Sequence, residues 1–225
     1  MSILGRNLYK RCKMKILYGT TNLAKLESMR KTLKDLDIEV IGLNSIAIKN
    51  DYIDETGNNP LENARIKALE YYKKAKMPVF SCDSGLYIKG LKSEQQPGVY
   101  VRRVNGKELT DEEMIEYYGG IARENGGQVF ARYENAICFV LDEKRIYEYQ
   151  GDEISSEEFI IIDKPHPRRN QGFPLDSLSV EKNSKKYYLD MNREEKGDKI
   201  GDGFRTFFKR YLLGYNNSSM EENNG

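Results

Sequence analysis

Three short segments in the first half of the chain carry residues of the kinds that bind phosphate and divalent cations. The first is Thr20-Thr-Asn-Leu-Ala-Lys25, which lies between an apolar run and a stretch with helical periodicity. Backbone N–H groups at a helix N-terminus favour an anion, and the hydroxyls, the amide and the ammonium of this segment add further donors. The segment therefore predicts an anion site formed by Thr20, Thr21, Asn22 and Lys25. The alternative is a helix N-cap followed by a solvated lysine, and the glycine spacing of a Walker loop is absent.

The second segment combines acidic residues with a lysine. It begins with Asp54-Glu-Thr-Gly57 and continues with Glu62-Asn-Ala-Arg-Ile-Lys67. Carboxylates on a loop, here that of Glu55, can hold a hard cation, and Lys67 lies near the start of a helix whose opposite face is apolar. The alternative is a solvated acidic loop beside a surface lysine.

The third segment, Val79-Phe-Ser-Cys-Asp-Ser-Gly-Leu86, places a carboxylate at the end of an apolar strand. Such a carboxylate is expensive to desolvate unless it is paired or binds a metal, so Asp83 is the strongest single candidate for metal binding and catalysis. The alternative is an aspartate that caps a turn.

His166 is the only histidine, and it lies between Pro165 and Pro167. A Ser-His-Asp triad would have to include it, but no nucleophile motif accompanies it. We interpret it as a solvated loop residue next to Arg168 and Arg169.

The elements that must position these segments alternate between strand and helix in the first half of the chain. Lys15–Gly19 and Ile38–Leu43 are apolar runs of strand length. Helical stripes are formed by Leu26, Met29, Leu33 and Leu36, and later by Leu61, Ala64, Ala68 and Tyr71/Tyr72. The second helix should begin at Pro60, a residue suited to a first turn. Val79–Ser81 and Leu86–Ile88 predict two short strands around a turn at residues 82–85.

The second half contains a further helix and a cluster of strands. Thr110-Asp-Glu-Glu113 has the spacing of a capping box, so a helix should run to about Asn125 and end at Gly126-Gly127. Stretches rich in aromatic and β-branched residues predict strands at Val129–Val140, Arg145–Gln150 and Phe159–Ile162. The fold class is therefore α/β with a mixed sheet. We expect one domain over residues 14–215, a basic N-terminal extension at 1–13 with Met14 as an alternative start, and a disordered tail at 216–225.

The bulk composition excludes several classes of protein. With 36 Lys+Arg against 35 Asp+Glu the net charge is +1. The chain as a whole therefore has no electrostatic field that would attract nucleic acid or a membrane surface, and we expect it to bind neither. Three cysteines without C-x-x-C spacing argue against a disulfide framework and a zinc site. No apolar run approaches the ~20 residues that span a bilayer. We therefore expect a soluble protein in a reducing compartment, the cytoplasm.

Together the motifs resemble those of the inosine triphosphatase family, which are pyrophosphatases of non-standard purine nucleotides. Gly19–Lys25 resembles the family's T-x-N-x-x-K phosphate loop, and Glu55–Gly57 with Glu62–Ala68 resembles its E-T-G and E-N-A-x-x-K-A block. The later matches are Asp83–Leu86 to D-S-G-L, Pro97–Tyr100 to P-G-x-Y, Gly172–Asp176 to G-F-G-Y-D, and Arg193–Lys196 to the lysine motif before the last helix. The resemblance covers residues 15–213.

The resemblance implies a role for each matching residue. The catalytic residues would be Asp83, Lys25 and Lys67. The ligands of Mg²⁺ would be Glu55 and Asp83. The substrate-binding residues would be Thr20, Thr21, Asn22, Lys25, Ser84, Phe173, Asp176 and Lys196. Asp83 would also activate the attacking water, and Phe173 would stack on the base. The implied fold is an elongated mixed sheet with flanking helices and two lobes around a central nucleotide cleft, in a homodimer.

The chain departs from the family pattern at three places. Cys82 stands where the family commonly has an acidic residue, and Pro174-Leu175 replaces the G-Y pair. Gly201-Asp202-Gly203 replaces a Ser-His-Arg tripeptide, which makes Asp202 a further candidate for substrate binding and leaves His166 as an alternative source of the histidine. Because an ionised Asp202 can only accept hydrogen bonds, we expect a weaker preference for 6-oxo purines than in the family.

We therefore expect a Mg²⁺-dependent nucleoside triphosphate pyrophosphatase that converts purine nucleotides such as ITP, dITP and XTP to the monophosphate and pyrophosphate. One alternative is a pyrophosphatase of the same fold with altered base specificity, for standard or modified purine nucleotides. Another is a catalytically weak nucleotide-binding homologue. The two carboxylates of Glu55 and Asp83 argue against a pure binder, because binding alone has little need for both.

Overall fold

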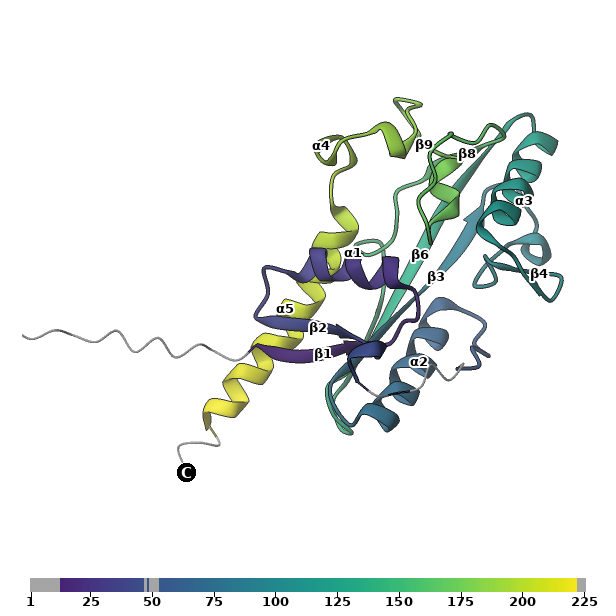
Figure 1. Cartoon of the computed structure of the whole chain (residues 1–225). Coiled ribbons are helices and arrows are strands. Elements are labelled where there is room, and N and C mark those ends of the chain that lie inside the picture. The colour runs from purple at the N-terminus through teal and green to yellow at the C-terminus, as the bar shows by residue number, and fades with distance from the viewer. Residues whose placement is uncertain (1–12, 47, 49–52, 222–225) are drawn as a thin grey trace, which may run out of the picture.

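The computed structural model describes residues 13–46, 48 and 53–221, and its centre is a seven-stranded sheet (Figure 1). The strands are β1 (Met14–Tyr18), β2 (Ile38–Gly42), β3 (Val79–Ile88), β6 (Gln128–Val140), β7 (Ile146–Gln150), β8 (Phe159–Ile162) and β9 (Ser179–Glu181). Their order is β2-β1-β3-β6-β8-β9, and β7 and β8 pair with different halves of β6. Strand β1 is parallel to β2 and β3, whereas β6 is antiparallel to its neighbours, so the predicted mixed sheet is confirmed. A separate hairpin is formed by β4 (Arg103–Val104) and β5 (Lys107–Glu108).

Strand β3 corrects one of the sequence-based predictions. Its 10 residues are continuous, so the predicted turn at residues 82–85 between two short strands is wrong. Every position pairs with β6, from Val79 opposite Val140 to Ile88 opposite Ala131. This long ladder outweighs the turn preference of an Asp-Ser-Gly sequence, because strand formation depends more on pairing partners than on local propensity. Asp83 therefore lies inside a strand and not at its end.

The described chain has five α-helices: α1 (Leu23–Leu33), α2 (Pro60–Ala75), α3 (Asp111–Glu124), α4 (Arg193–Lys196) and α5 (Lys199–Glu221). Helices α1 and α5 pack against each other on one face, and α2 packs on the other face against β3 and β6 (Figure 1). Helix α3 lies at the far end of the long strands, beside β8 (Figure 1).

Local signals set the ends of these helices. Asn59 caps α2 by accepting a hydrogen bond from the Glu62 N–H (2.9 Å), and Pro60 is the first helical residue, as predicted. Thr110 and Glu113 form the predicted capping box of α3, and that helix ends just before a pair of glycines with positive φ.

Two main groups of core residues lie along the long strands. The predicted stripe of α1 is buried with Phe204, Phe207 and Phe208 of α5 against the half of the sheet that contains β1 and β2. At the other end, Leu86 and Ile88 of β3 pack with residues of α3 and β8. We call these parts the α1/α5 half and the α3 half. Strands β3 and β6 run through both halves. On β3, Asp83 lies between Phe80 of the first core and Leu86 of the second.

Helix α5 extends to Glu221, so the tail predicted at residues 216–225 begins within the bounds of this helix. Adding residues to an existing helix costs little once its packed part has formed. The rest of the predicted tail and residues 1–12 of the predicted extension lie outside the described residues. Within the described chain, every helix is too short or too polar to cross a membrane.

Candidate active site

The loop after β1 is organised by Asn22, which caps helix α1. Its Oδ1 accepts hydrogen bonds from the N–H groups of Ala24 (2.9 Å) and Lys25 (3.2 Å). Thr20 Oγ1 accepts one from the Asn22 N–H (3.2 Å), and Thr21 is exposed beside it. The N-cap interpretation is therefore correct for Asn22, and the same geometry presents the positive end of a helix to an anion.

Lys25 is not the solvated lysine of the alternative interpretation. Burial and the charge of Lys67 lower the pKa of its ammonium, against the opposing charge of Asp83. Among the described residues, no carboxylate forms an ion pair with its Nζ. A partly desolvated ammonium without such a partner is costly, and a bound anion would reduce that cost. The position of Lys25 in the first turn of α1 therefore favours phosphate.

Glu55, Lys67 and Asp83 form the charged centre of the site. Lys67 Nζ lies 2.8 Å from Asp83 Oδ1 and 3.0 Å from Glu55 Oε2. Asp83 is only 8 % exposed, and the Lys67 side chain is 13 % exposed. Although burial lowers it, the two carboxylates together raise the pKa of Lys67 above its usual value, so this ammonium stays charged at neutral pH. Lys67 is therefore part of a partly buried ion cluster and not a solvated surface lysine.

The two carboxylates are also the residues that could hold a cation. Their oxygens converge on one position, that of the Lys67 ammonium. Proteins usually bind Mg²⁺ through one or two carboxylates and leave the other positions to water and substrate phosphates. In the described part of the chain, no group of three His, Cys, Asp or Glu side chains could form a fuller cage. Glu55 and Asp83 thus fit a Mg²⁺ site that a bound phosphate would complete.

Asn63 is a site residue to which the sequence analysis gave no role. Its Nδ2 donates to Asp83 Oδ2 (3.2 Å), and its Oδ1 accepts from the Gly57 N–H (2.8 Å). The side chain is 2 % exposed and links the loop of Glu55 to strand β3. The signal for this role was an asparagine next to the apolar stripe of the helix that carries Lys67. A buried amide needs hydrogen-bond partners, so such a residue indicates a polar contact in the interior.

Cys82 and Ser84 flank Asp83 on β3 and point to the opposite face of the sheet, since side chains alternate along a strand. Cys82 packs against the α1/α5 core and forms a hydrogen bond with Tyr18. Burial raises the pKa of the Cys82 thiol to about 12, in spite of that hydrogen bond. The thiol therefore stays neutral and cannot replace the charge of an acidic residue. Ser84 is half-buried.

The turn that carries Phe173 lies directly against the phosphate loop. Gly172 has a φ of 82°, and a Cβ there would meet the Ala24 Cβ at 3.2 Å, so glycine is required. Its carbonyl accepts from Asn22 Nδ2 (3.5 Å), and its N–H donates to Asp111 Oδ2 (3.2 Å). Asn22 thus connects the phosphate loop with the segment predicted to hold the base.

Asp176 lies on the same segment in a desolvated environment. Burial raises the pKa of its carboxyl group, against the hydrogen bond from Asn170 and the charge of Lys196. Asn170 Nδ2 donates to Asp176 Oδ2 over 2.7 Å. The structure therefore places Phe173 and Asp176 on one segment and puts Lys196 within electrostatic range of Asp176.

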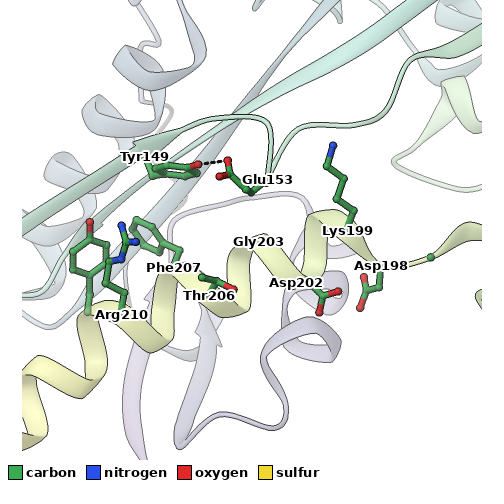
Figure 2. A pocket seen from close by; sticks show the side chains of 11 residues that line it. Tyr149, Glu153, Asp198, Lys199, Asp202, Gly203, Thr206, Phe207 and Arg210 are labelled. Carbon is green, nitrogen blue, oxygen red and sulfur yellow. Dashed lines mark hydrogen bonds between the residues drawn. The ribbon is translucent and has the colours of Figure 1, made fainter.

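Asp202 lies apart from this group, in the first turn of α5. Its side chain is 74 % exposed and pairs with Arg205 (2.5 Å), so this carboxylate is neither buried nor unpaired. Asp202 lines a cavity of about 610 Å³ between α5 and the loop after β7 (Figure 2). Figure 2 shows Tyr149 and Glu153 hydrogen-bonded on the wall of this cavity that faces α5.

His166 is held by contacts outside the charged centre. Its Nε2 lies 3.2 Å from Asp190 Oδ1, and its Nδ1 accepts from the Arg168 N–H (3.0 Å). The side chain is only 12 % exposed, so the prediction of a solvated histidine is wrong. Its ring packs edge-on against Tyr187. These contacts give His166 a role in holding its loop.

Comparisons with known proteins identify relatives over most of the chain. The dITP/XTP pyrophosphatase of Thermoanaerobacter pseudethanolicus is 32% identical over 187 residues, which cover 81% of this chain and 88% of that protein. The dITP/XTP pyrophosphatase of Thermus thermophilus is 28% identical over 89% of this chain and 93% of its own length. A HAM1 protein from Coxiella burnetii has a similar structure, with a TM-score of 0.66 at 25% identity over 91% of this chain and 99% of the other.

The same fold is found in the Staphylococcus aureus Ham1 protein, with a TM-score of 0.63 at 22% identity over 91% of this chain and 99% of the other. The elongated mixed sheet with flanking helices is thus common to these structures. The family model described as the Ham1 family matches residues 16–200, which include the loop of Lys25, the Glu55–Lys67–Asp83 cluster and the Phe173 turn. The chain therefore belongs to the Ham1 family.

Proposed function

We propose that the chain is a Mg²⁺-dependent nucleoside triphosphate pyrophosphatase that hydrolyses purine nucleotides such as ITP, dITP and XTP to the monophosphate and pyrophosphate. The observation that carries the proposal is the ion cluster of Lys67 with Glu55 and Asp83 beside the half-buried Lys25 at the start of α1. The two ammonium groups and the two carboxylates thus lie close to the N-terminus of a helix, which itself favours phosphate. Two relatives described as dITP/XTP pyrophosphatases support this substrate class.

In this proposal the chain's own residues mainly position the substrate and supply charge. Lys25, Lys67 and the N-terminal end of α1 neutralise phosphate oxygens. Asp83 accepts a proton from a water that attacks the α-phosphorus, while its second oxygen stays bonded to Asn63. The bond between the α-phosphorus and the bridging oxygen breaks, and pyrophosphate leaves with the bonding electrons. Held by Glu55 and Asp83, Mg²⁺ would withdraw charge from the phosphate oxygens.

The test is release of pyrophosphate, measured as phosphate after treatment with inorganic pyrophosphatase, over a panel of ITP, dITP, XTP, GTP and ATP. We expect activity with Mg²⁺ and none with excess EDTA. Asp83→Asn keeps the size of the side chain but removes the base and one metal charge, so turnover should fall by at least ~10²-fold. Full activity of this variant would show that Asp83 is only structural.

The same panel separates the alternatives. A nucleotide-binding homologue would bind without releasing pyrophosphate, and a pyrophosphatase with altered specificity would prefer GTP or ATP. We also propose a homodimer in the cytoplasm that binds neither nucleic acid nor membrane. Light scattering during size-exclusion chromatography, and imaging of the tagged protein in its native cells, would test the dimer and the location.

A further inference from the structure

Gly201-Asp202-Gly203, at the start of α5, stands in place of the missing tripeptide and offers one side chain, that of Asp202. A Cβ on Gly203 would lie 2.6 Å from the Glu153 carbonyl carbon, so the helix packs directly against that loop. A Cβ on Gly201 would lie 2.7 Å from Asp198 Cγ. Asp202, between them, is exposed and paired with Arg205. These three positions therefore provide no unpaired side chain for hydrogen bonds to a base.

The turn that carries Phe173 has polar groups of the required kind. The Phe173 N–H donates to the Asn170 carbonyl (2.9 Å), which closes a turn over these four residues. The Asp176 N–H donates in turn to the Phe173 carbonyl (3.1 Å). Asn170, Phe173 and Asp176 thus form one compact unit, and Gly172 ties that unit to the phosphate loop.

The amide of Asn170 has a defined orientation within this unit. An ionised carboxylate only accepts hydrogen bonds, so the amide nitrogen must face Asp176, at 2.7 Å. One N–H and the Oδ1 atom are left over, and no other described residue bonds to them. The side chain is exposed, so both groups are accessible to a ligand. Adjacent acceptor and donor atoms of an amide match the N1–H and 6-oxo groups of a purine lactam.

We propose that Asn170 is the specificity-determining residue for the base, accepting a hydrogen bond from N1–H and donating one to the 6-oxo group of hypoxanthine or xanthine. Asp176 is its positioning residue, because it prevents the amide from turning over. Adenine presents an acceptor at N1 and a donor at its amino group, so both hydrogen bonds would be lost with a fixed amide. This inference rests on the proposed function, since it names the substrate class of that same site.

The test is kcat/KM for ITP, XTP and ATP in Asn170→Ala and in Gln171→Ala. Gln171 is an exposed amide on the same turn without a side-chain hydrogen bond to any described residue, and it serves as the matched control. We expect Asn170→Ala to lower kcat/KM for ITP and XTP by about tenfold or more, as for loss of hydrogen bonds in a specific site, and to leave ATP unchanged. Gln171→Ala should leave all three values unchanged.

Asp176→Asn provides a second test, because an amide at this position can donate to Asn170 Oδ1 and let the Asn170 amide turn over. The ratio of ITP to ATP turnover should then fall, with ATP improving in absolute terms. Dissociation constants of IMP and AMP, measured by calorimetry, should change in the same direction. An equal loss for all nucleotides in Asn170→Ala would overturn the inference. Absence of pyrophosphate release from the unmodified protein would instead overturn the proposed function, and the calorimetry would still test Asn170.

Discussion

At the scale of single residues, Lys25 and Cys82 show how removal from water changes the pKa of a side chain. Both lie near the end of β1, yet burial acts on them in opposite senses. It lowers the pKa of an ammonium and raises the pKa of a thiol, because the neutral form is favoured in each case. Lys25 thereby loses its proton at a lower pH than an ordinary lysine, and the thiol of Cys82 stays neutral.

The first prediction concerns the alkaline side of the pH profile. Phosphate binding needs the protonated form of Lys25, and the lowered pKa means that this form is lost at a lower pH than in an ordinary lysine. The kcat/KM for ITP should therefore fall as pH rises through that pKa, since this ratio reports the free enzyme. Lys25→Arg keeps its charge at all accessible pH values and should shift the fall to higher pH. An unchanged profile in the arginine variant would assign the fall to another group.

The second prediction concerns thiol reactivity. With a pKa of about 12, Cys82 is almost fully protonated at pH 8, and only the thiolate reacts with iodoacetamide. In a Cys12→Ser background, alkylation of the folded chain should be far slower than that of a free cysteine, whose pKa is about 8.5. Peptide mass spectrometry gives the rate at Cys82 separately from that at Cys138. Rapid modification of Cys82 at pH 8 would contradict the burial described here.

At the scale of elements, the start of α5 is fixed by close contact with the loop after β7. The Cα of Gly203 lies against the backbone of Glu153, and Lys199 forms an ion pair with Glu157. A backbone atom cannot move aside as the end of a flexible side chain can. The glycine is therefore a packing requirement of this contact.

The third prediction compares two glycines in helices. Gly203→Ala should destabilise the chain by about 1–3 kcal/mol through overpacking against the Glu153 carbonyl group. Gly120→Ala, in the interior of α3 with nothing within 4 Å of its Cβ position, should stabilise it by about 0.5–1 kcal/mol. Urea unfolding of both variants measures the two free energies. Equal effects would show that α5 can move away from the loop at little cost.

The elements show which features could be predicted from sequence. The first residues of α2 and α3 were predictable, because Pro60 and the Thr110–Glu113 capping box act within the first turn of each helix. The continuity of β3 through Asp83 was not, since the partner strand that sustains it lies about fifty residues further along the chain. For the same reason the contacts of Lys67 and the role of Asn63 became visible only when α2 packed against β3. The candidate residues were identifiable, but their contacts were not.

At the scale of the whole molecule, the first half of α5 packs across the part of the sheet that contains β1 and β2 (Figure 1). Phe208 is fully buried, with its ring 5.0 Å from that of Phe80 and 5.5 Å from that of Phe139, measured between centroids. These contacts join the last helix to β3 and β6, which carry both halves. Stability of the whole fold should therefore depend on α5.

The fourth prediction follows from that contact. Phe208→Ala should lower the free energy of unfolding by about 3–5 kcal/mol, as is usual for removing a buried phenylalanine. Leu23→Ala is the control, because Leu23 is 63% exposed and its loss should cost less than about 0.5 kcal/mol. Chemical denaturation followed by circular dichroism gives both values. A small effect of the Phe208 variant would mean that α5 contributes little to the fold.

The ladder between β3 and β6 also limits how the molecule can move. Its uninterrupted pairing passes from one core to the other, and a hinge between the halves would have to break main-chain hydrogen bonds. The ladder therefore opposes a hinge motion between the halves of the kind seen in two-domain binding proteins. Capture of a nucleotide must rely on rearrangements of loops and side chains, and the radius of gyration measured by X-ray scattering should stay the same when nucleotide binds. The enzyme would then work as a rigid frame that sets the distance between base and phosphate, and so measures the length of its substrate.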